Sequence, residues 1–183
     1  MGGVISAIFD ALFGKKLEVV LLGLANSGKT TLLSYISVGA PPPKQPLPTL
    51  GSNSKLFQRG NVTIKAWDVG GQATFREGWT LYAENSDCIL FVVDSSDPEK
   101  LPEAKRELHA LLENPNLSGL PMIVACNKSD IPERLSRAEL EKALNLDYIN
   151  PEHQTIHIVD ISALTGTNVD QVAKLMTLYA KAK

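Results

Sequence analysis

A glycine-rich loop lies between a predicted strand and a predicted helix near the start of the chain, and it restricts the class of fold. Residues 17–22 are apolar except for Glu18, a composition typical of a short buried strand, and residues 29–37 have the apolar periodicity of a helix. The joining segment, Gly23-Leu-Ala-Asn-Ser-Gly28-Lys29-Thr30, matches the phosphate-binding pattern G-x-x-x-x-G-K-[ST]. In such a loop backbone N–H groups point at an anion, and the following helix directs its positive end to the same place. The segment therefore predicts a nucleoside phosphate site.

Two side chains of this loop have predicted roles in nucleotide binding. Lys29 would neutralise the outer phosphates, and the Thr30 hydroxyl would be a ligand of Mg²⁺. The predicted nucleotide-binding residues of the segment are Gly23, Ala25, Asn26, Ser27, Gly28, Lys29, Thr30 and Thr31.

Strands and helices alternate along the rest of the chain. Further strands are predicted at 53–58, 62–67, 87–93, 121–126 and 155–161, and helices at 98–113, 136–144 and 168–183. The strands at 53–58 and 62–67 read as a hairpin, whereas the other strands are continuously apolar, as in a parallel sheet covered on both faces. We therefore expect an α/β fold with a mostly parallel six-stranded sheet, one antiparallel edge strand and helices on both faces.

Size and charge set outer limits on function. A chain of 183 residues with 44% hydrophobic residues fits one globular domain. Its 18 basic and 20 acidic side chains give a net charge of −2, which argues against a general nucleic-acid binder. Cys88 and Cys126 lie in apolar runs and are expected to be buried, reduced thiols of a cytosolic protein.

A second motif, Asp68-Val-Gly-Gly71-Gln72, follows the predicted strand at 62–67. Ligands bind at the carboxyl ends of parallel strands, so this motif and the phosphate loop should face the same crevice. Asp68 would hold the metal through water, and the Gly71 N–H could approach a γ-phosphate because no side chain blocks it. Gln72 would orient an attacking water.

A third motif, Asn127-Lys128-Ser129-Asp130, follows the predicted strand at 121–126. The Asp130 carboxylate can accept hydrogen bonds from the N1–H and the exocyclic amino group of guanine. Adenine has an acceptor at N1 and no 2-amino group, so the motif selects guanine. Lys128 can lay its stem along the base. After the last predicted strand, Ser162-Ala163 can present the Ala163 N–H to the guanine oxygen.

Thr49 is the candidate second protein ligand of Mg²⁺. It follows a stretch with five prolines among residues 41–48, a composition that forbids a helix or a central strand and predicts a stiff exposed loop. A loop held only by the metal and the γ-phosphate would be ordered with triphosphate and released after hydrolysis. The loop that carries Thr49 is therefore predicted to switch between an ordered and a released conformation with the state of the nucleotide.

The N-terminus carries a lipidation pattern and an amphipathic segment. Gly2 and Ser6 match M-G-x-x-x-[ST], the N-myristoylation pattern, and the apolar residues of this segment recur at the spacing of one helix face. One myristoyl chain binds membranes weakly, so the helix, Lys15 and Lys16 would supply the second signal. We expect residues 1–14 to form a membrane helix and residues 15–183 the GTPase domain. The alternative is a surface helix packed on its own domain, with Gly2 unmodified.

With these motifs, the chain resembles a small GTPase of the ADP-ribosylation factor (Arf) and Arf-like family over essentially its whole length. The specific marks are the Gly2 start, Pro48-Thr-Leu-Gly51, Trp67-Asp-Val-Gly-Gly-Gln72, Phe75-Arg76 followed by Trp79 and Tyr82, and the Asn-Lys-x-Asp box. The segments 60–65 and 106–113 are most similar to the lysosome-associated Arf-like branch, whose members usually lack the Gly2 signal.

The resemblance implies a P-loop GTPase fold that binds GTP or GDP with Mg²⁺. It implies an exchange factor, a GTPase-activating protein and effectors that read the switches and an aromatic cluster, here Trp67 and Tyr82. It also implies that the N-terminal helix leaves its retracted position in the GTP form as the hairpin shifts register, and that the protein acts in vesicle or organelle traffic. The protein would be cytoplasmic and reversibly bound to the cytosolic face of Golgi, endosomal or lysosomal membranes.

The chain departs from the family pattern at two positions. Ala25 stands where the family usually has Asp, which could alter hydrolysis or nucleotide affinity in either direction. Ser52 stands where the family has Phe, so the effector cluster lacks one aromatic ring. No arginine stands out as able to reach the γ-phosphate, and one supplied by a partner is worth about 10³–10⁵ in rate, so slow intrinsic turnover is expected.

Two other functions stay open. One is a GTP-binding scaffold with little or no turnover, which Ala25 leaves possible. The other is a phosphoryl transferase that acts on an adenine nucleotide, which predicts ATP binding and an acceptor pocket. The sequence has no obvious lid or acceptor-binding arginine cluster, and Asp130 favours guanine.

Overall fold

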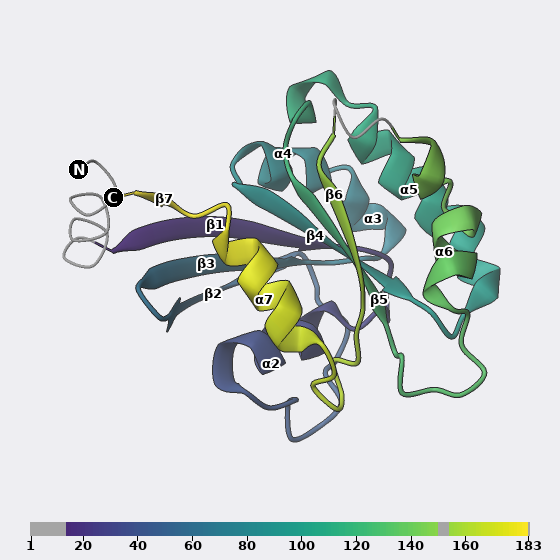
Figure 1. Ribbon diagram of the computed structural model, residues 1–183, viewed down its shortest axis with the longest axis horizontal. Helices are drawn as coiled ribbons and strands as arrows, with labels where there is room; N and C mark the ends of the chain where they lie inside the picture. The colour runs from purple at the N-terminus through teal and green to yellow at the C-terminus, as the bar shows by residue number, and fades with distance from the viewer. Residues whose placement is uncertain (1–13, 150–153, 183) are drawn as a thin grey trace, which may run out of the picture.

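A twisted sheet runs through the centre of the computed structural model, which describes residues 14–149 and 154–182 (Figure 1). Six strands lie in the order β2-β3-β1-β4-β5-β6. They are β1 (Lys15–Leu22), β2 (Ser52–Arg59), β3 (Val62–Val69), β4 (Cys88–Asp94), β5 (Met122–Asn127) and β6 (Ile156–Asp160). The predicted N-terminal helix and Gly2 lie outside the described residues.

The pairing of these strands confirms the predicted fold class. β2 runs antiparallel to β3, with Ser52 opposite Val69 and Arg59 opposite Val62. The pairs β1–β3, β1–β4, β4–β5 and β5–β6 are parallel. The hairpin therefore adds the expected antiparallel edge strand to a parallel sheet.

Helices cover both faces of the sheet, as the continuously apolar strands predicted. α2 (Lys29–Val38) and α7 (Val169–Thr177) lie on one face, and α4 (Trp79–Glu84), α5 (Leu101–Leu112) and α6 (Arg137–Ala143) on the other (Figure 1). Within β1, Leu17, Val19 and Leu21 enter the first core, whereas Val20 and Leu22 enter the second. Successive strand residues point to opposite faces, so the stretch of β1 from Val19 to Leu22, which is buried on both faces, is apolar throughout.

The C-terminal end differs from the prediction of a helix to residue 183. α7 ends at Thr177, and a seventh, two-residue strand, β7 (Lys181–Ala182), pairs antiparallel with Lys15 and Lys16 of β1. The Tyr179 hydroxyl lies 2.6 Å from His157 Nε2, and Lys181 Nζ lies 2.6 Å from Asp87 Oδ1. These contacts hold the end of the chain against the sheet in place of a further helical turn.

Several short elements had no sequence signal. They are α3 (Ala73–Arg76), α4 and the 3₁₀ turns η2 (Pro115–Leu117) and η3 (Leu146–Tyr148), whereas the 3₁₀ turn η1 (Pro98–Lys100) forms the start of the helix predicted at 98–113. An element of three to six residues is too short for an apolar period to be recognised. α4 is instead anchored by Trp79, which is 2% exposed and packs edge-on against Phe91. Among the described residues, none of the helices has the length and apolar character that crossing a bilayer requires.

Candidate nucleotide-binding site

A cavity of about 620 Å³ opens where the loops after β1, β3, β5 and β6 meet the proline-rich segment. The predicted residues that line it are Ala25, Asn26, Gly28, Lys29, Thr30, Thr31, Thr49, Gly71, Gln72, Asn127, Lys128, Asp130 and Ala163. Four more, Gly23, Ser27, Asp68 and Ser162, are buried behind this lining or contact it through hydrogen bonds. The fold thus brings the predicted motifs to one site.

Two glycines allow the phosphate loop to close tightly. Gly23 has φ +138°, and a Cβ there would lie 2.2 Å from the carbonyl oxygen of Val92. Gly28 has φ +96°, and a Cβ there would lie 2.1 Å from Asn127 Nδ2. L-residues with a side chain rarely adopt these φ values, and the space is already filled. Both positions therefore require glycine in this conformation.

Asn127 connects the phosphate loop to the loop after β6. Its Nδ2 donates to the Ser27 carbonyl at 2.7 Å, and its Oδ1 accepts from the Ala163 N–H at 2.9 Å. The Ala163 N–H, predicted to serve the guanine oxygen, is thus used by Asn127 in this structure. Ser162 Oγ donates to Asp130 Oδ1 at 2.6 Å, which orients the exposed carboxylate assigned to guanine.

Lys29 lies in the first turn of α2 with its side chain folded under the phosphate loop. Its Nζ donates to the carbonyls of Gly23 and Leu24 at 2.9 and 3.0 Å, and the residue is 6% exposed. Burial lowers the Lys29 pKa to about 8, against the attraction of Asp68 and with a further lowering by Arg76. Phosphate oxygens at this site would supply the negative charge that keeps the ammonium protonated.

Three oxygen-bearing side chains converge at the predicted Mg²⁺ position. Thr30 Oγ1 donates to Asp68 Oδ2 at 2.6 Å, and Thr49 Oγ1 lies 3.2 Å from both Thr30 Oγ1 and Asp68 Oδ2. Asp68 Oδ1 is buried and has no hydrogen-bond partner in the described part of the chain. Mg²⁺ prefers oxygen ligands and keeps several waters, so hydroxyl ligands with a carboxylate behind them fit this ion.

The segment after β3 closes against the phosphate loop. A Cβ on Gly71 would lie 2.4 Å from the Gly23 oxygen and the Leu24 carbonyl carbon, and 2.5 Å from the Ala25 nitrogen. Gln72 directly precedes α3, and its side chain lines the cavity. The site therefore places a glycine backbone and a carboxamide beside the end of the cavity assigned to the outer phosphates.

The two predicted effector residues lie outside the cavity and contact each other. The ring centroids of Trp67 and Tyr82 are 5.5 Å apart, and Lys65 Nζ lies 4.6 Å from the Trp67 ring centroid. Ser52, which replaces the expected aromatic residue, shares a 2.7 Å hydrogen bond with the Tyr82 hydroxyl. A polar contact therefore joins β2 to α4 at this position.

Some site residues were missed by the sequence analysis. Gln45, Pro46, Leu47, Pro48, Ile131 and Leu164 line the cavity, although none of them was assigned to the nucleotide site. Asp94 was also missed: its Oδ2 lies 2.5 Å from Lys128 Nζ and so directs the lysine predicted to contact the base. Asp94 ends a buried strand, which is the one sequence signal that could have identified it.

Comparisons with known proteins agree with this geometry. The model of the ADP-ribosylation factor family matches residues 5–179. ADP-ribosylation factor-like protein 8b of Arabidopsis thaliana is 36% identical over 170 residues, which are 93% of this chain and 91% of the relative. The Arl6 BBS3 small GTPase of Trypanosoma brucei, solved with the nucleotide analogue GppNp, is 33% identical with a TM-score of 0.79, covering 89% of this chain and 96% of that one.

A more distant likeness concerns the fold alone. The structure of the mammalian SRP receptor has a TM-score of 0.73 at 18% identity, covering 88% of this chain and 99% of that chain. The arrangement of strands and helices is therefore shared well beyond the range of close sequence similarity.

Proposed function

The chain belongs to the ADP-ribosylation factor family of GTP-binding switches, and from that premise we propose that it recruits effector proteins to membranes in vesicle or organelle traffic. The observation that carries this proposal is the convergence of two loops at the outer-phosphate end of the cavity. The Thr49 hydroxyl lies 3.2 Å from Asp68, and Gly71 lies against the phosphate loop. Both loops are thus placed to respond to a γ-phosphate.

The proline-rich loop has few other attachments, which supports its role as the mobile part of the switch. The side chains that flank Thr49 on this loop, Leu47 and Leu50, are 87% and 77% exposed, so apolar burial does not hold the loop in place. Loss of the metal and the γ-phosphate would leave only weak polar contacts at Thr49. We therefore propose that hydrolysis releases this loop and that effectors read its ordered form.

The attachment to membranes is proposed to depend on residues 1–14, with a myristoyl group on Gly2. Exchange factors and activating proteins would set the nucleotide state, and effectors would contact the switches together with Trp67 and Tyr82. The proposed location is the cytosolic face of Golgi, endosomal or lysosomal membranes. Intrinsic turnover would be slow, because Gln72 can orient water but an arginine must come from the activating protein.

Flotation with lipid vesicles tests the membrane proposal. The acylated full chain, loaded with GppNp, is expected to float with anionic vesicles, and the GDP-loaded protein is expected to remain largely in the lower fraction. Gly2→Ala should abolish flotation in both states, because the helix alone gives weak binding. Gly3→Ala, which keeps the acylation pattern, is the matched control. Equal flotation in both nucleotide states would contradict a nucleotide-controlled membrane switch.

A scaffold that binds GTP without turnover is the second candidate, favoured by Ala25 in the phosphate loop. Single-turnover hydrolysis in the presence of cell extract separates it from a cycling switch. Gln72→Leu is expected to lower the stimulated rate by about 10²-fold or more, since positioned polar groups of this kind contribute on the order of 10²–10⁴. Gln171→Leu, on the exposed side of α7, should leave the rate unchanged. Equal and negligible rates in the wild type and Gln72→Leu would favour the scaffold.

A further inference from the structure

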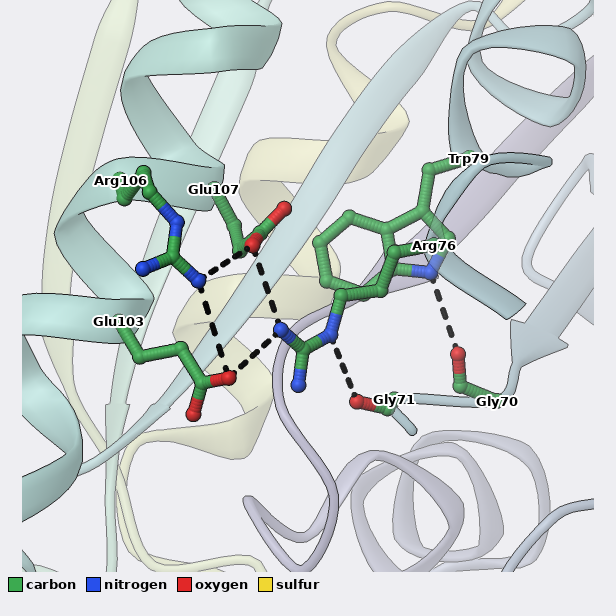
Figure 2. Close-up of polar contacts among 7 residues, drawn as sticks. All are labelled: Gly70, Gly71, Arg76, Trp79, Glu103, Arg106 and Glu107. Carbon is green, nitrogen blue, oxygen red and sulfur yellow. Dashed lines mark hydrogen bonds and ion pairs between the residues drawn. The ribbon is translucent and has the colours of Figure 1, made fainter. Parts of the chain in front are cut away.

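The backbone carbonyls of Gly70 and Gly71, next to the phosphate loop, each accept a hydrogen bond from a side chain of α3 or α4 (Figure 2). The Trp79 indole Nε1 donates to the Gly70 carbonyl at 3.1 Å. The Arg76 Nε donates to the Gly71 carbonyl at 3.0 Å. The protein therefore controls the orientation of both peptide planes through their oxygens.

The geometry of the peptide bond transmits this control to the opposite side of the chain. The peptide bonds of the described residues are trans, so each C=O points opposite to the N–H of the same plane. The plane held by Trp79 carries the Gly71 N–H, and the plane held by Arg76 carries the Gln72 N–H. Both N–H groups therefore point away from their clamping side chains, and both residues line the cavity.

Arg76 is itself held by two carboxylates of α5. Its Nη1 lies 2.8 Å from Glu103 Oε1 and 3.2 Å from Glu107 Oε1, and its side chain is 12% exposed (Figure 2). The hydrogen bond from Arg76 also lowers the pKa of Glu103, which is the direction expected when a cation stabilises the carboxylate. A planar guanidinium can serve three acceptors at once, which an ammonium on a flexible stem does far less well.

We infer that Arg76 and Trp79 are positioning residues, which aim the Gly71 and Gln72 N–H groups at the γ-phosphate, and that Glu103 and Glu107 anchor this clamp to α5. The inference rests on the proposed GTP site. The phosphate loop and the guanine-side residues have their own supports, among them Lys29 and Asn127. The clamp therefore acts on triphosphate recognition and leaves diphosphate binding alone. It also gives α5, outside the cavity, a direct connection to the switch.

Arg76→Gln tests the clamp against a matched control on the same carboxylates. Arg106 Nη2 lies 3.1 Å from Glu107 and 3.8 Å from Glu103, is 68% exposed, and has no contact with Gly71 among the described residues. Arg76→Gln is expected to weaken GppNp binding about tenfold while GDP affinity changes less than twofold, because it removes charge-assisted hydrogen bonds. Arg106→Gln should change both affinities less than twofold. An unchanged ratio of the two affinities in Arg76→Gln, or an equal loss of both, would overturn the inference.

Amide hydrogen exchange of residues 70–76 in the full-length protein gives a second readout, which needs no triphosphate. Arg76→Gln and the double variant Glu103→Gln/Glu107→Gln are expected to speed exchange in this segment, whereas Arg106→Gln is not. Arg76→Lys, which keeps the charge, should restore less than half of the protection. Unchanged exchange in both clamp variants would refute the clamp. If the wild type bound no guanine nucleotide, the proposed function would fall, and the exchange rates would still decide the clamp.

Discussion

Asp130→Asn is expected to weaken GDP binding by roughly 10²–10³-fold and to remove the preference for GDP over ADP. The carboxylate is exposed in the cavity and oriented by Ser162 Oγ at 2.6 Å. Asparagine would replace one accepting oxygen by an NH₂ group, which cannot accept from the guanine N1–H or amino group. Losing hydrogen bonds to a charged acceptor and leaving the donors buried costs about 1.5–3 kcal/mol each, and 1.4 kcal/mol is a factor of ten.

Titration calorimetry on nucleotide-stripped protein with Mg²⁺ measures this change. The variant should bind xanthosine diphosphate (XDP) more tightly than the wild type does. Xanthine carries a carbonyl oxygen where guanine has its 2-amino group, and the asparagine NH₂ group can donate to that oxygen. Asp147→Asn, an exposed aspartate outside the cavity, is the matched control and should keep the affinity for GDP. A wild type that binds ADP as tightly as GDP would refute the guanine assignment and favour the adenine-nucleotide enzyme.

Gly71→Ala is expected to reduce GppNp affinity by about 10²-fold or more while GDP binding is largely kept. The new Cβ would lie 2.4–2.5 Å from backbone atoms of residues 23–25, which cannot move aside without opening the phosphate loop. The segment after β3 would instead have to withdraw from the cavity, and the Gly71 N–H with it. A diphosphate lacks the γ-phosphate that this segment is proposed to contact, so GDP binding should be little affected.

Gly78→Ala is the matched control for this variant. The nearest atoms to a Cβ on Gly78 are the Phe75 oxygen at 3.5 Å and a Tyr82 ring carbon at 4.0 Å, which are ordinary contacts. Displacement of a fluorescent GDP analogue measures both affinities in both variants. If Gly71→Ala bound GppNp as tightly as the wild type does, contact between Gly71 and a γ-phosphate would be contradicted.

Much of the fold could be predicted from local patterns. The strand, loop and helix of residues 15–38 lie within two residues of their predicted limits, because an apolar run, a glycine loop and a helical period are each properties of neighbouring residues. The capping box of α6 was also readable, since Ser136 and Glu139 are three positions apart, and it is present. The alternating order of elements then restricted the sheet to a mostly parallel one.

The elements that the analysis missed depend on distant partners. β7 pairs with β1 at the far end of the chain, and the contacts Lys181–Asp87 and Tyr179–His157 beside it join residues that no local pattern connects. α4 depends on the packing of Trp79 against Phe91. The stabilisation that these contacts give to β7 and α4 cannot be evaluated from the sequence, because the partners meet only in the folded chain. Local propensity therefore favoured a longer last helix and left α4 unrecognised.

For the candidate site, residue types and their spacing were enough to predict a chemistry: amides and a lysine for phosphate, hydroxyls for Mg²⁺, and a carboxylate for guanine. These assignments concern what individual groups can bind, which depends on their own atoms. Distances and partners came only with tertiary structure. Thr49 meets Asp68 across 19 positions of sequence, and Arg76 meets Glu103 and Glu107 across 27 and 31. Which side chains hold the switch in place is decided by packing between remote elements, and packing is a property of the folded chain as a whole.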